Sequence, residues 1–232
     1  MMVELLKRDA LTDEMVNRVA AEIAAFQSEA GRTEEIVRLG GLEAVKINVD
    51  EDFDQTRKYI GITVTSEQYS SLQAYSQVFI EVKEAVIRQR ESSGTVRDCH
   101  GDLHTAQICM ENGISVIDCI EFNERFRYSD VACDIAFLAM DLDCNERPDL
   151  SRLLVDTYVQ KSGDEGVREF MDFYKKCIAH TSVAMSPALT GTTPTCRRRP
   201  RSLPERRLGA IFSLLPRMCR FSQSRRWCCS RG

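Results

Sequence analysis

The sequence predicts an α+β protein that is mainly helical and carries one small β-hairpin. Apolar residues recur at helical spacing in long segments on both sides of residue 94. Between these segments, two short β-prone runs flank the turn Glu111-Asn112-Gly113, and an Asn-Gly pair in this setting is typical of a hairpin. With 232 residues, 43% of them hydrophobic, the chain has enough apolar material for a sizeable core.

The first predicted helix begins after Thr12. Thr12 is a good N-cap, and Asp13 and Glu14 place negative charge in the first turn, where the helix dipole favours it. Gly31 is expected to end this helix. The apolar positions that recur at helical spacing between these ends are Met15, Val16, Val19, Ala20, Ile23 and Phe26.

A second helical region is predicted between residues 42 and 94. Gly40-Gly41 should interrupt the chain before a segment over 42–59 that is helical in parts. Ser66 is expected to cap a long helix that stops near Gly94. The apolar stripe predicted to face the core of that helix contains Leu72, Tyr75, Phe79, Val82, Val86 and Ile87.

The hairpin and three further helices complete the predicted body. The two hairpin strands are expected over 107–110 and 114–117. Helix returns over 130–142, where apolar residues resume helical spacing, and over 148–159, which opens with a proline, a good first-turn residue. A last helix is expected over 165–178. The body is therefore predicted to be helical with the hairpin inserted in it.

Charge divides the chain into two parts. The sequence contains 31 Lys+Arg and 35 Asp+Glu, a formal net charge of −4. From Cys196 onward there are 11 Arg, no Lys and one acid, a local charge of +10, whereas the first 195 residues hold 20 basic and 34 acidic side chains, a charge of −14. Apolar periodicity also stops near residue 178. We therefore divide the chain into a body over 1–178 and a basic tail over 179–232.

The tail admits three interpretations. Clustered arginines neutralise phosphates, so the tail is a candidate for binding nucleic acid or an anionic surface. Its Pro, Ser and Arg content is also typical of a disordered extension. We favour the third, a frame-shifted or otherwise non-homologous end, because periodicity is lost abruptly and the charge switches from acidic to Arg-only. On that interpretation we expect no nucleic-acid partner.

Composition and motifs exclude several classes of protein. No apolar run approaches the roughly 20 residues that span a bilayer, so we expect no membrane protein. The segment Met1–Asp9 lacks the apolar stretch of a secretory signal. The ten cysteines include no CxxC pair, which argues against a zinc ribbon. Reduced, mostly buried thiols and a cytoplasmic location are therefore expected.

The most informative polar residues bracket the hairpin. The run from His100 to His104 precedes it, and Asp118 ends its second strand. Folding of the hairpin closes the 16-residue gap between Asp102 and Asp118, so both carboxylates are expected to face one small volume. One carboxylate can orient a hydroxyl and accept its proton, and a second can hold Mg²⁺ against phosphate oxygens. Phosphoryl transfer needs both roles close together, because its catalysis is mostly positioning and charge neutralisation.

Two other interpretations compete for this run. On a strand, the alternating residues His100, Asp102 and His104 would share one face and form a transition-metal site. The glycine at position 101 and the lack of β-branched residues favour a loop instead. The second alternative is that His100 and Asp102 only stabilise a turn. The hairpin and Asp118 weaken that alternative.

Longer stretches of the sequence resemble a known family. Residues 97–143 begin with Arg-Asp-Cys-His-Gly-Asp-Leu-His, continue with Ile-Asp-Cys-Ile-Glu-Phe-Asn-Glu-Arg-Phe-Arg-Tyr, and end in Ala-Met-Asp-Leu-Asp. This pattern resembles the catalytic core of aminoglycoside phosphotransferase-type kinases, more narrowly the bacterial branch often joined to a C-terminal P-loop ATP-binding domain. The resemblance extends from about Leu5 to about Ile178. It implies the mainly helical C-terminal lobe of a protein-kinase-like fold, with the catalytic loop carried by the hairpin.

The resemblance also implies a role for each polar residue of this region. Asp102 would be the catalytic base, and Asp118 would be the metal ligand that corresponds to the DFG aspartate of kinases. His100 would hold the loop in shape, and His104 would support it. Further supporting positions are Glu121, either near the metal or in a solvated loop, and Asp130 and Asp134, for which we favour a structural role.

Two departures from the family pattern bear on activity. The family places its second metal ligand, an asparagine, five residues after the catalytic aspartate, and here that position is Gln107, whose longer side chain shifts the oxygen. The nucleotide-covering N-terminal lobe is not found ahead of this region, and neither GxGxxG nor GxxxxGK[ST] occurs. Lys7 and Lys46 do not fit the phosphate-binding lysine. We therefore expect weak or no ATP binding by this chain, and a separate ATP-binding domain or lobe as its partner.

The leading hypothesis is a partial, kinase-like phosphotransferase that uses Mg²⁺ and ATP to phosphorylate the hydroxyl of a small molecule. One alternative is a catalytically inactive module that binds a small molecule or a protein. Another is nucleic-acid binding through the Arg-rich tail.

Overall fold

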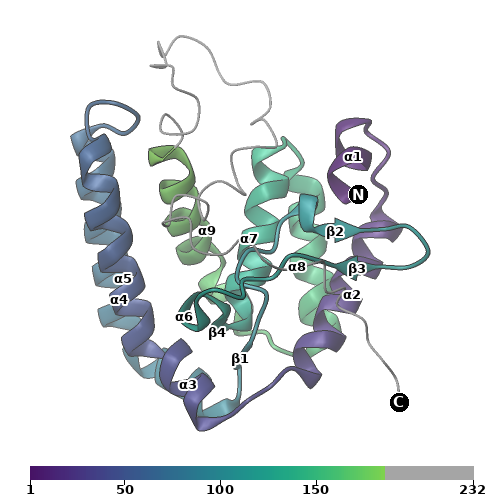
Figure 1. The fold of residues 1–232 in the computed structure, drawn as a ribbon, viewed down its shortest axis with the longest axis horizontal. Helices are drawn as coiled ribbons and strands as arrows, with labels where there is room; N and C mark the ends of the chain where they lie inside the picture. The colour runs from purple at the N-terminus through teal and green to yellow at the C-terminus, as the bar shows by residue number, and fades with distance from the viewer. Residues whose placement is uncertain (186–232) are drawn as a thin grey trace.

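Residues 1–185 are described in the computed structural model, and they form a mainly helical body with two short antiparallel β-ladders (Figure 1). The longer helices are α2 (Asp13–Glu29), α4 (Leu42–Thr56), α5 (Ser66–Ser93), α7 (Val131–Cys144), α8 (Pro148–Ser162) and α9 (Val167–Ala184). The shorter ones are α1 (Met2–Lys7), α3 (Glu34–Gly40) and α6 (Glu124–Arg127), with 3₁₀ turns at Arg57–Tyr59 and Thr105–Gln107. The strands are β1 (Val96–Asp98), β2 (Ile108–Cys109), β3 (Ser115–Val116) and β4 (Tyr128–Asp130). This is the α+β class that the sequence predicts.

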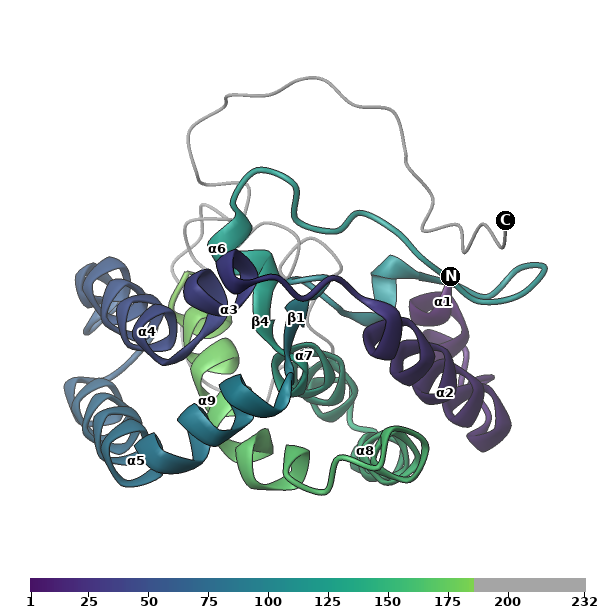
Figure 2. The same cartoon turned by 90° about the horizontal axis from the view of Figure 1, so that it is seen from below.

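The core is organised around α7. Every residue of this helix from Val131 to Leu142 except Cys133 is buried, as expected for a helix that is apolar on nearly all sides. Helices α8 and α9 pack against α7, and α2 packs against α8. Helices α4 and α5 lie side by side at the opposite edge of the molecule from α1 and α2 (Figures 1 and 2). The segments that carry the candidate site residues pass between these two groups.

Strands β2 and β3 form the predicted hairpin. Ile108 pairs with Val116, and the antiparallel register continues through the next pair. At the turn, Asn112 and Gly113 adopt φ angles of 56° and 119°, the left-handed region that these residue types tolerate best. The hairpin is thus confirmed, although its ladder is shorter than the two predicted runs.

A second ladder, between β1 and β4, is absent from the sequence prediction. Val96 pairs with Asp130, and Asp98 pairs with Tyr128. Each strand has three residues, which is too short for a period of two to stand out in the sequence. The two strands flank the whole loop and hairpin, so this ladder closes the base of the candidate site.

Helix N-termini largely follow the predicted capping residues. The Thr12 side chain accepts a hydrogen bond from the backbone of Met15 and caps α2 as predicted. The prediction that Ser66 caps α5 was wrong, because Thr65 is the N-cap. Thr65 and Gln68 form a reciprocal capping box that satisfies two backbone donors, which a cap one residue later would not do.

The buried face of α5 also differs from the predicted stripe. Val82 is 69% exposed, whereas Ile80 is buried. The buried face includes Ser76, whose hydroxyl contacts the Cys177 thiol at 3.5 Å. A count of apolar residues alone passes over such a polar member. The other five residues of the predicted stripe lie in the core or pack against it, so the predicted face is confirmed except at Val82.

The last two helices are longer than predicted. Helix α8 continues to Ser162, where Gly163 ends it in a left-handed conformation. Helix α9 continues to Ala184, six residues past the predicted end, because its last turns bury polar residues such as His180 that break the apolar pattern. Residues 186–232 lie outside the described residues, and with them most of the predicted basic tail.

All six cysteines among the described residues are free thiols. Cys99 is buried and the other five are half-buried, so their burial is less complete than predicted. Between residues 1 and 185, none of the helices combines the length and the apolar character needed to cross a bilayer.

Helix α3 and strand β4 approach each other closely at Gly40. A Cβ at this position would lie 2.6 Å from the carbonyl carbon and oxygen of Tyr128 and 2.9 Å from the backbone nitrogen of Ser129. We expect Gly40→Ala to lower the free energy of unfolding by about 1–3 kcal/mol, because rigid backbone must move to make room. Urea unfolding measures this change.

Gly31→Ala is the matched control for Gly40→Ala. A Cβ at Gly31 would contact Ile36 Cδ1 at 3.4 Å, an ordinary van der Waals distance. We expect this variant to change stability by less than about 0.5 kcal/mol. Equal losses in the two variants would show that the approach of α3 to β4 does not require a glycine.

Candidate functional site

The run from His100 to His104 forms a loop between β1 and the 3₁₀ turn, and α7 holds its start. The Asp134 carboxylate of α7 accepts hydrogen bonds from the backbone N–H groups of His100 and Gly101, both at 2.9 Å. Gln27 of α2 donates to the same carboxylate at 3.3 Å. Hydrogen bonds to an ionised acceptor are stronger than neutral ones, so the buried Asp134 fixes the loop backbone.

A second aspartate of α7 holds the end of the loop. Asp141 Oδ2 accepts hydrogen bonds from Thr105 N at 2.8 Å and from Thr105 Oγ1 at 2.6 Å. Its Oδ1 accepts from Asn145 Nδ2 at 3.1 Å. Asp134 and Asp141 are seven residues apart, two helical turns, and therefore lie on one face of α7. Asp141 was not predicted from the sequence. Its position two turns after Asp134, on a strongly apolar helix, could have indicated that both carboxylates share a buried role.

Removal of the Asp141 carboxylate should destabilise the protein. Asp141→Ala leaves the buried N–H and hydroxyl of Thr105 without their acceptor, and we expect a loss of about 2–3 kcal/mol in the free energy of unfolding. Asp143→Ala is the control, because Asp143 forms a half-exposed surface pair with Lys175 and should lose less than about 1 kcal/mol. Thermal unfolding of both variants measures the difference, and similar losses would refute the role given to Asp141.

His100 connects the loop to the end of the hairpin. Its Nδ1 accepts from the backbone N–H of Asp102 at 3.2 Å, so the ring proton lies on Nε2 and is donated to the carbonyl of Ile117 at 2.9 Å. Burial lowers the pKa of His100, which keeps the ring neutral. Because both ring nitrogens are engaged with the backbone, His100, Asp102 and His104 do not form the transition-metal site considered above.

Asp102 is the one buried carboxylate of the loop that keeps an oxygen without a hydrogen bond. Its Oδ1 is buried and accepts no hydrogen bond from the described residues, and its Oδ2 lies 3.7 Å from His104 Nε2. Burial, and to a smaller extent the nearby charges of Asp118, Asp134 and Asp141, raise the pKa of Asp102 to about 8. Asp102 is thus held at a fixed place with its acceptor capacity unused.

His104 lies beside this carboxylate. Its Nδ1 accepts from the backbone N–H of Ala106 at 3.3 Å, which places the ring proton on Nε2, the atom nearest Asp102. Burial lowers the pKa of His104, so the ring is a neutral donor. Its Nε2 has no hydrogen-bond partner in residues 1–185.

The structure also brings together the two predicted metal ligands. Gln107 Nε2 donates a hydrogen bond to Asp118 Oδ2 at 3.3 Å. The backbones of the two segments are joined beside them, where the Gln107 backbone carbonyl accepts from Ile117 N at 2.9 Å. Asp118 is exposed and has a φ of 63°. Residues 1–185 contain no group of three or more His, Cys, Asp or Glu side chains that could together hold a metal ion. Two oxygen-bearing side chains fit Mg²⁺, which takes few protein ligands and completes its shell with water and phosphate oxygens.

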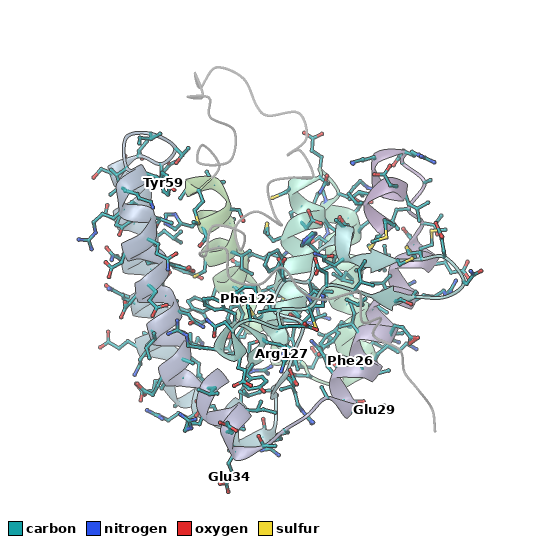
Figure 3. All side chains as sticks on the ribbon, in the orientation of Figure 1. Phe26, Glu29, Glu34, Tyr59, Phe122 and Arg127 are labelled. Carbon is teal, nitrogen blue, oxygen red and sulfur yellow. The ribbon has the colours of Figure 1, made fainter. Side chains whose placement is uncertain are left out.

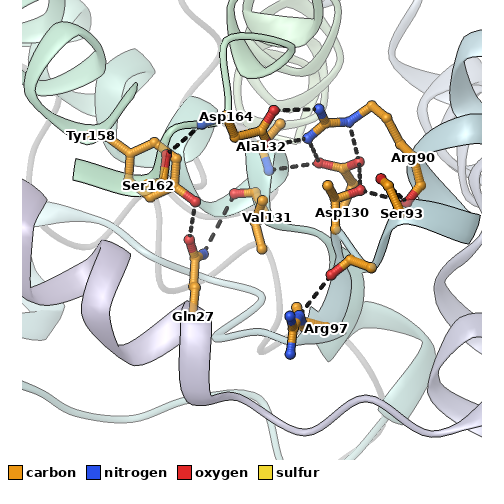
Figure 4. A network of polar contacts seen from close by, with 12 residues as sticks. Gln27, Arg90, Ser93, Arg97, Asp130, Val131, Ala132, Tyr158, Ser162 and Asp164 are labelled. Carbon is orange, nitrogen blue, oxygen red and sulfur yellow. Dashed lines mark hydrogen bonds and ion pairs between the residues drawn. The ribbon is translucent and has the colours of Figure 1, made fainter. Parts of the chain in front are cut away.

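Glu121 and Asp130 lie apart from this group. Glu121 is exposed, and among the described residues no hydrogen bond or ion pair joins it to Asp102 or Asp118. Asp130 accepts hydrogen bonds from Arg90 Nε at 2.6 Å and Arg90 Nη2 at 2.8 Å, and it caps α7 through Ala132 N at 2.9 Å (Figure 4). Its carboxylate is therefore engaged in holding helices together.

A cavity of about 180 Å³ lies beside the loop that contains Gly101 and Asp102. Helices α4, α7 and α9 and the segment 125–129 form its walls, and Gly101, the residue before Asp102, lines it as well. In Figure 3, Phe122 and Arg127 mark the segment that leads from the hairpin into β4, near the middle of the molecule. The loop that carries Asp102 thus contributes Gly101 to the wall of this partly open cavity.

The cavity is mainly apolar but contains charged groups. Its aromatic lining residues are Phe126, Tyr128, Phe137, Phe173 and Tyr174. Glu51 and Arg125, which both line it, form an ion pair with 3.0 Å between Oε1 and Nη1. Asp52 also lines it, and burial raises the pKa of this carboxyl to about 7. These residues were not predicted from the sequence, because acidic residues on a partly buried helix form no recognisable sequence motif.

Comparison with known proteins gives relatives but no activity. No protein-family model matches the sequence. It is similar to uncharacterized proteins of Mycobacterium bovis and of two Mycobacterium tuberculosis strains, each 28% identical over 201 residues. The match covers 86% of this chain and 39% of each relative, so the chain spans about two fifths of their length. No solved structure matches it.

Proposed function

We propose that this chain is part of a kinase-like phosphotransferase similar to aminoglycoside phosphotransferases. The enzyme would transfer the γ-phosphoryl group of ATP to the hydroxyl of a small molecule, and this chain would activate that hydroxyl. The observation that carries the proposal is Asp102. Its carboxylate is buried on a loop whose backbone is fixed by Asp134, Asp141 and His100, and its Oδ1 has no hydrogen-bond partner among the described residues. A preorganised, unused acceptor of this kind suits a general base.

The chemistry assigned to Asp102 is the removal of one proton. The ionised carboxylate accepts the proton of the substrate hydroxyl, the hydroxyl oxygen forms a bond to the γ-phosphorus, and the bond from that phosphorus to the β–γ bridging oxygen breaks to release ADP. A raised pKa of about 8 makes Asp102 a stronger base than an ordinary carboxylate and places its titration near neutral pH. His104 Nε2, 3.7 Å from Oδ2, is placed to hold the carboxylate in position.

Asp118 and Gln107 would hold Mg²⁺ in this proposal. When bound, the ion neutralises charge on the phosphate oxygens. Their side chains lie within 3.3 Å of each other at the end of the hairpin nearest the loop, and the negative charge of Asp118 acts on Asp102. The hairpin therefore supports both roles that the sequence suggested for its two ends.

Nucleotide binding in the proposal depends on a separate ATP-binding domain or lobe. The sequence contains no glycine-rich phosphate loop, and its mycobacterial relatives are more than twice as long as the segment that matches. We place the reaction in the cytoplasm, where ATP is available and free thiols such as Cys99 are stable. The cavity beside Gly101 is the proposed acceptor pocket.

A radiolabel experiment tests the proposal. The full chain is incubated with Mg²⁺ and millimolar γ-labelled ATP in the presence of a small-molecule extract, and products are separated after acid quenching. We expect slow transfer of label to a small molecule, because the nucleotide is weakly held, and no transfer by Asp102→Asn. Wild-type protein that yields no labelled product, or equal labelling by Asp102→Asn, would favour the alternative of an inactive small-molecule-binding module.

A further inference from the structure

The wall of the cavity formed by α4 presents an unused acceptor, on Asn48, and a carboxylate, Asp52. Asn48 and Asp52 are four residues apart, so they lie on one face of α4, and both line the cavity. Asn48 Oδ1 is buried and has no hydrogen-bond partner within residues 1–185. A buried acceptor without a partner, one turn from a carboxylate in the same cavity, indicates a ligand that brings both a hydrogen-bond donor and positive charge. An ammonium group supplies both.

The net charge of the residues that line the cavity indicates a ligand with one positive charge. Its acidic and basic lining residues are Glu51, Asp52 and Arg125, and Glu51 and Arg125 neutralise each other. Asp52 has no cationic partner among the described residues, although the Thr181 side chain donates a hydrogen bond to it. Burial raises the pKa of this carboxyl to about 7, and the neighbouring charge of Glu51 acts in the same direction. A single ammonium group beside Asp52 would balance the cavity.

The remaining walls indicate the rest of the ligand. Aromatic rings from α7, α9 and the segment 125–129 are among its lining residues. Rings of this kind bind apolar groups and stabilise a neighbouring cation. A polycationic amino sugar would instead place hydroxyls and further ammonium groups against apolar walls with no partners, which is unfavourable.

We propose that the acceptor substrate is a compact amino alcohol with one ammonium group and a mainly apolar body, whose ammonium group binds Asn48 and Asp52. This inference rests on the proposed function, because it assigns the substrate class of the same site. The hydroxyl then lies toward Gly101, which lines the cavity and precedes Asp102 in the chain. The resemblance to enzymes that modify aminoglycosides does not extend to the substrate, because the site and not the fold determines what is bound.

Calorimetry with matched probes tests the substrate class. The full chain is titrated at pH 8, without nucleotide, with 2-amino-1-phenylethanol and with 1-phenylethanol, which lacks the amine. We expect the amine to bind at least about tenfold more tightly, the effect of one charge-assisted contact. Asp52→Asn should reduce this ratio to within about twofold, and Asn48→Ala should reduce it by about threefold.

Asp54→Asn is the matched control. Asp54 is an exposed residue of the same helix that pairs with Arg57, and its variant should keep the full ratio between the two probes. Equal binding of the two probes by wild type, an unchanged ratio in both cavity variants, or tighter binding of the aminoglycoside kanamycin than of the amine would overturn the proposed substrate class. Circular dichroism of each variant confirms that it is folded.

The same measurements separate this inference from the proposed function. Asp102→Asn should keep the preference for the amine, because Asp102 is assigned to the proton and not to the ammonium group. A preserved preference together with no phosphoryl transfer by wild type would contradict the proposed reaction and leave the ligand class supported. Phosphoryl transfer without any preference for the amine would contradict the ligand class alone.

Discussion

Arg90→Met is expected to lower the free energy of unfolding by about 3–5 kcal/mol, the effect of leaving buried carboxylates without their cation. Arg90 lies at the end of α5 and is 6% exposed. Its guanidinium donates to Asp130 at 2.6 and 2.8 Å and to Asp164 at 2.8 Å through two nitrogens (Figure 4). One side chain therefore joins α5, the start of α7 and the turn between α8 and α9.

The electrostatics of this network explain the size of the effect. Burial alone would lower the pKa of Arg90, but the bonds to Asp130 and Asp164 raise it above its ordinary value, so the guanidinium stays charged. Without it, Asp130 retains Thr95 and the N-terminus of α7 as partners but loses both charge-assisted bonds. Urea unfolding at pH 7 measures the loss.

Arg88→Met is the control for this prediction. Arg88 lies on the same helix, is 52% exposed and pairs with Glu84 and Glu43 at the surface. Its removal should change stability by about 1 kcal/mol or less, because solvent screens exposed pairs. Comparable losses in Arg88→Met and Arg90→Met would refute a special role for the buried network.

Asp102→Asn is expected to lower phosphoryl transfer by about 10²–10⁴-fold while leaving the protein at least as stable as wild type. The first effect follows from the loss of the proposed base. The second follows because asparagine has nearly the same shape but needs no charge in a buried site where one carboxylate oxygen has no partner. Rates of ADP and product formation, with denaturant unfolding in parallel, measure both.

The stability effect of Asp102→Asn should depend on pH. In the folded protein the pKa of Asp102 is raised to about 8, whereas in the unfolded chain it is close to the ordinary value of 3.8. Between these values the folded state holds the proton that the unfolded state has released, so this group lowers stability as the pH rises from about 4 to about 8. The variant should therefore gain stability relative to wild type between pH 5 and pH 8.

One control variant and two possible contrary results test the Asp102 prediction. Glu111→Gln, in the exposed hairpin turn, should keep the wild-type rate and the wild-type pH dependence of stability. An Asp102→Asn protein that transfers phosphate at the wild-type rate would reject Asp102 as base. A stability difference that stays constant from pH 5 to pH 8 would reject its raised pKa.

The sequence was informative where structure depends on neighbours in the chain. The N-cap of α2, the break at Gly40-Gly41 and the Asn112-Gly113 hairpin are each set by a few adjacent residues, and each was predicted. The errors at α5 and α9 came from polar residues on buried faces, such as Ser76 and His180. Their partners, Cys177 and Thr56, lie on other helices, so a one-dimensional pattern does not show why they are buried.

Part of the candidate site could be predicted for the same reason. The loop containing Asp102 and the hairpin ending at Asp118 are close in sequence, so a single turn brings them together. Asp141 and the acceptors of α4 were missed. Asp141 is far from Thr105 in the chain, and Asn48 and Asp52 are ordinary residues of an amphipathic helix until α7 and α9 enclose them.

By itself the sequence determined the long helices, the Thr12 cap of α2, the hairpin and the run of residues around Asp102, because helix period, capping and turn geometry act over a few residues. Only the tertiary structure decided which of these carboxylates form stabilising hydrogen bonds and which one keeps an oxygen without a hydrogen-bond partner. Asp130 and Asp134 are engaged by Arg90 and by the loop backbone, while Asp102 is not. The role of a buried charge depends on the partner that packing brings to it, and helix packing joins residues far apart in the chain.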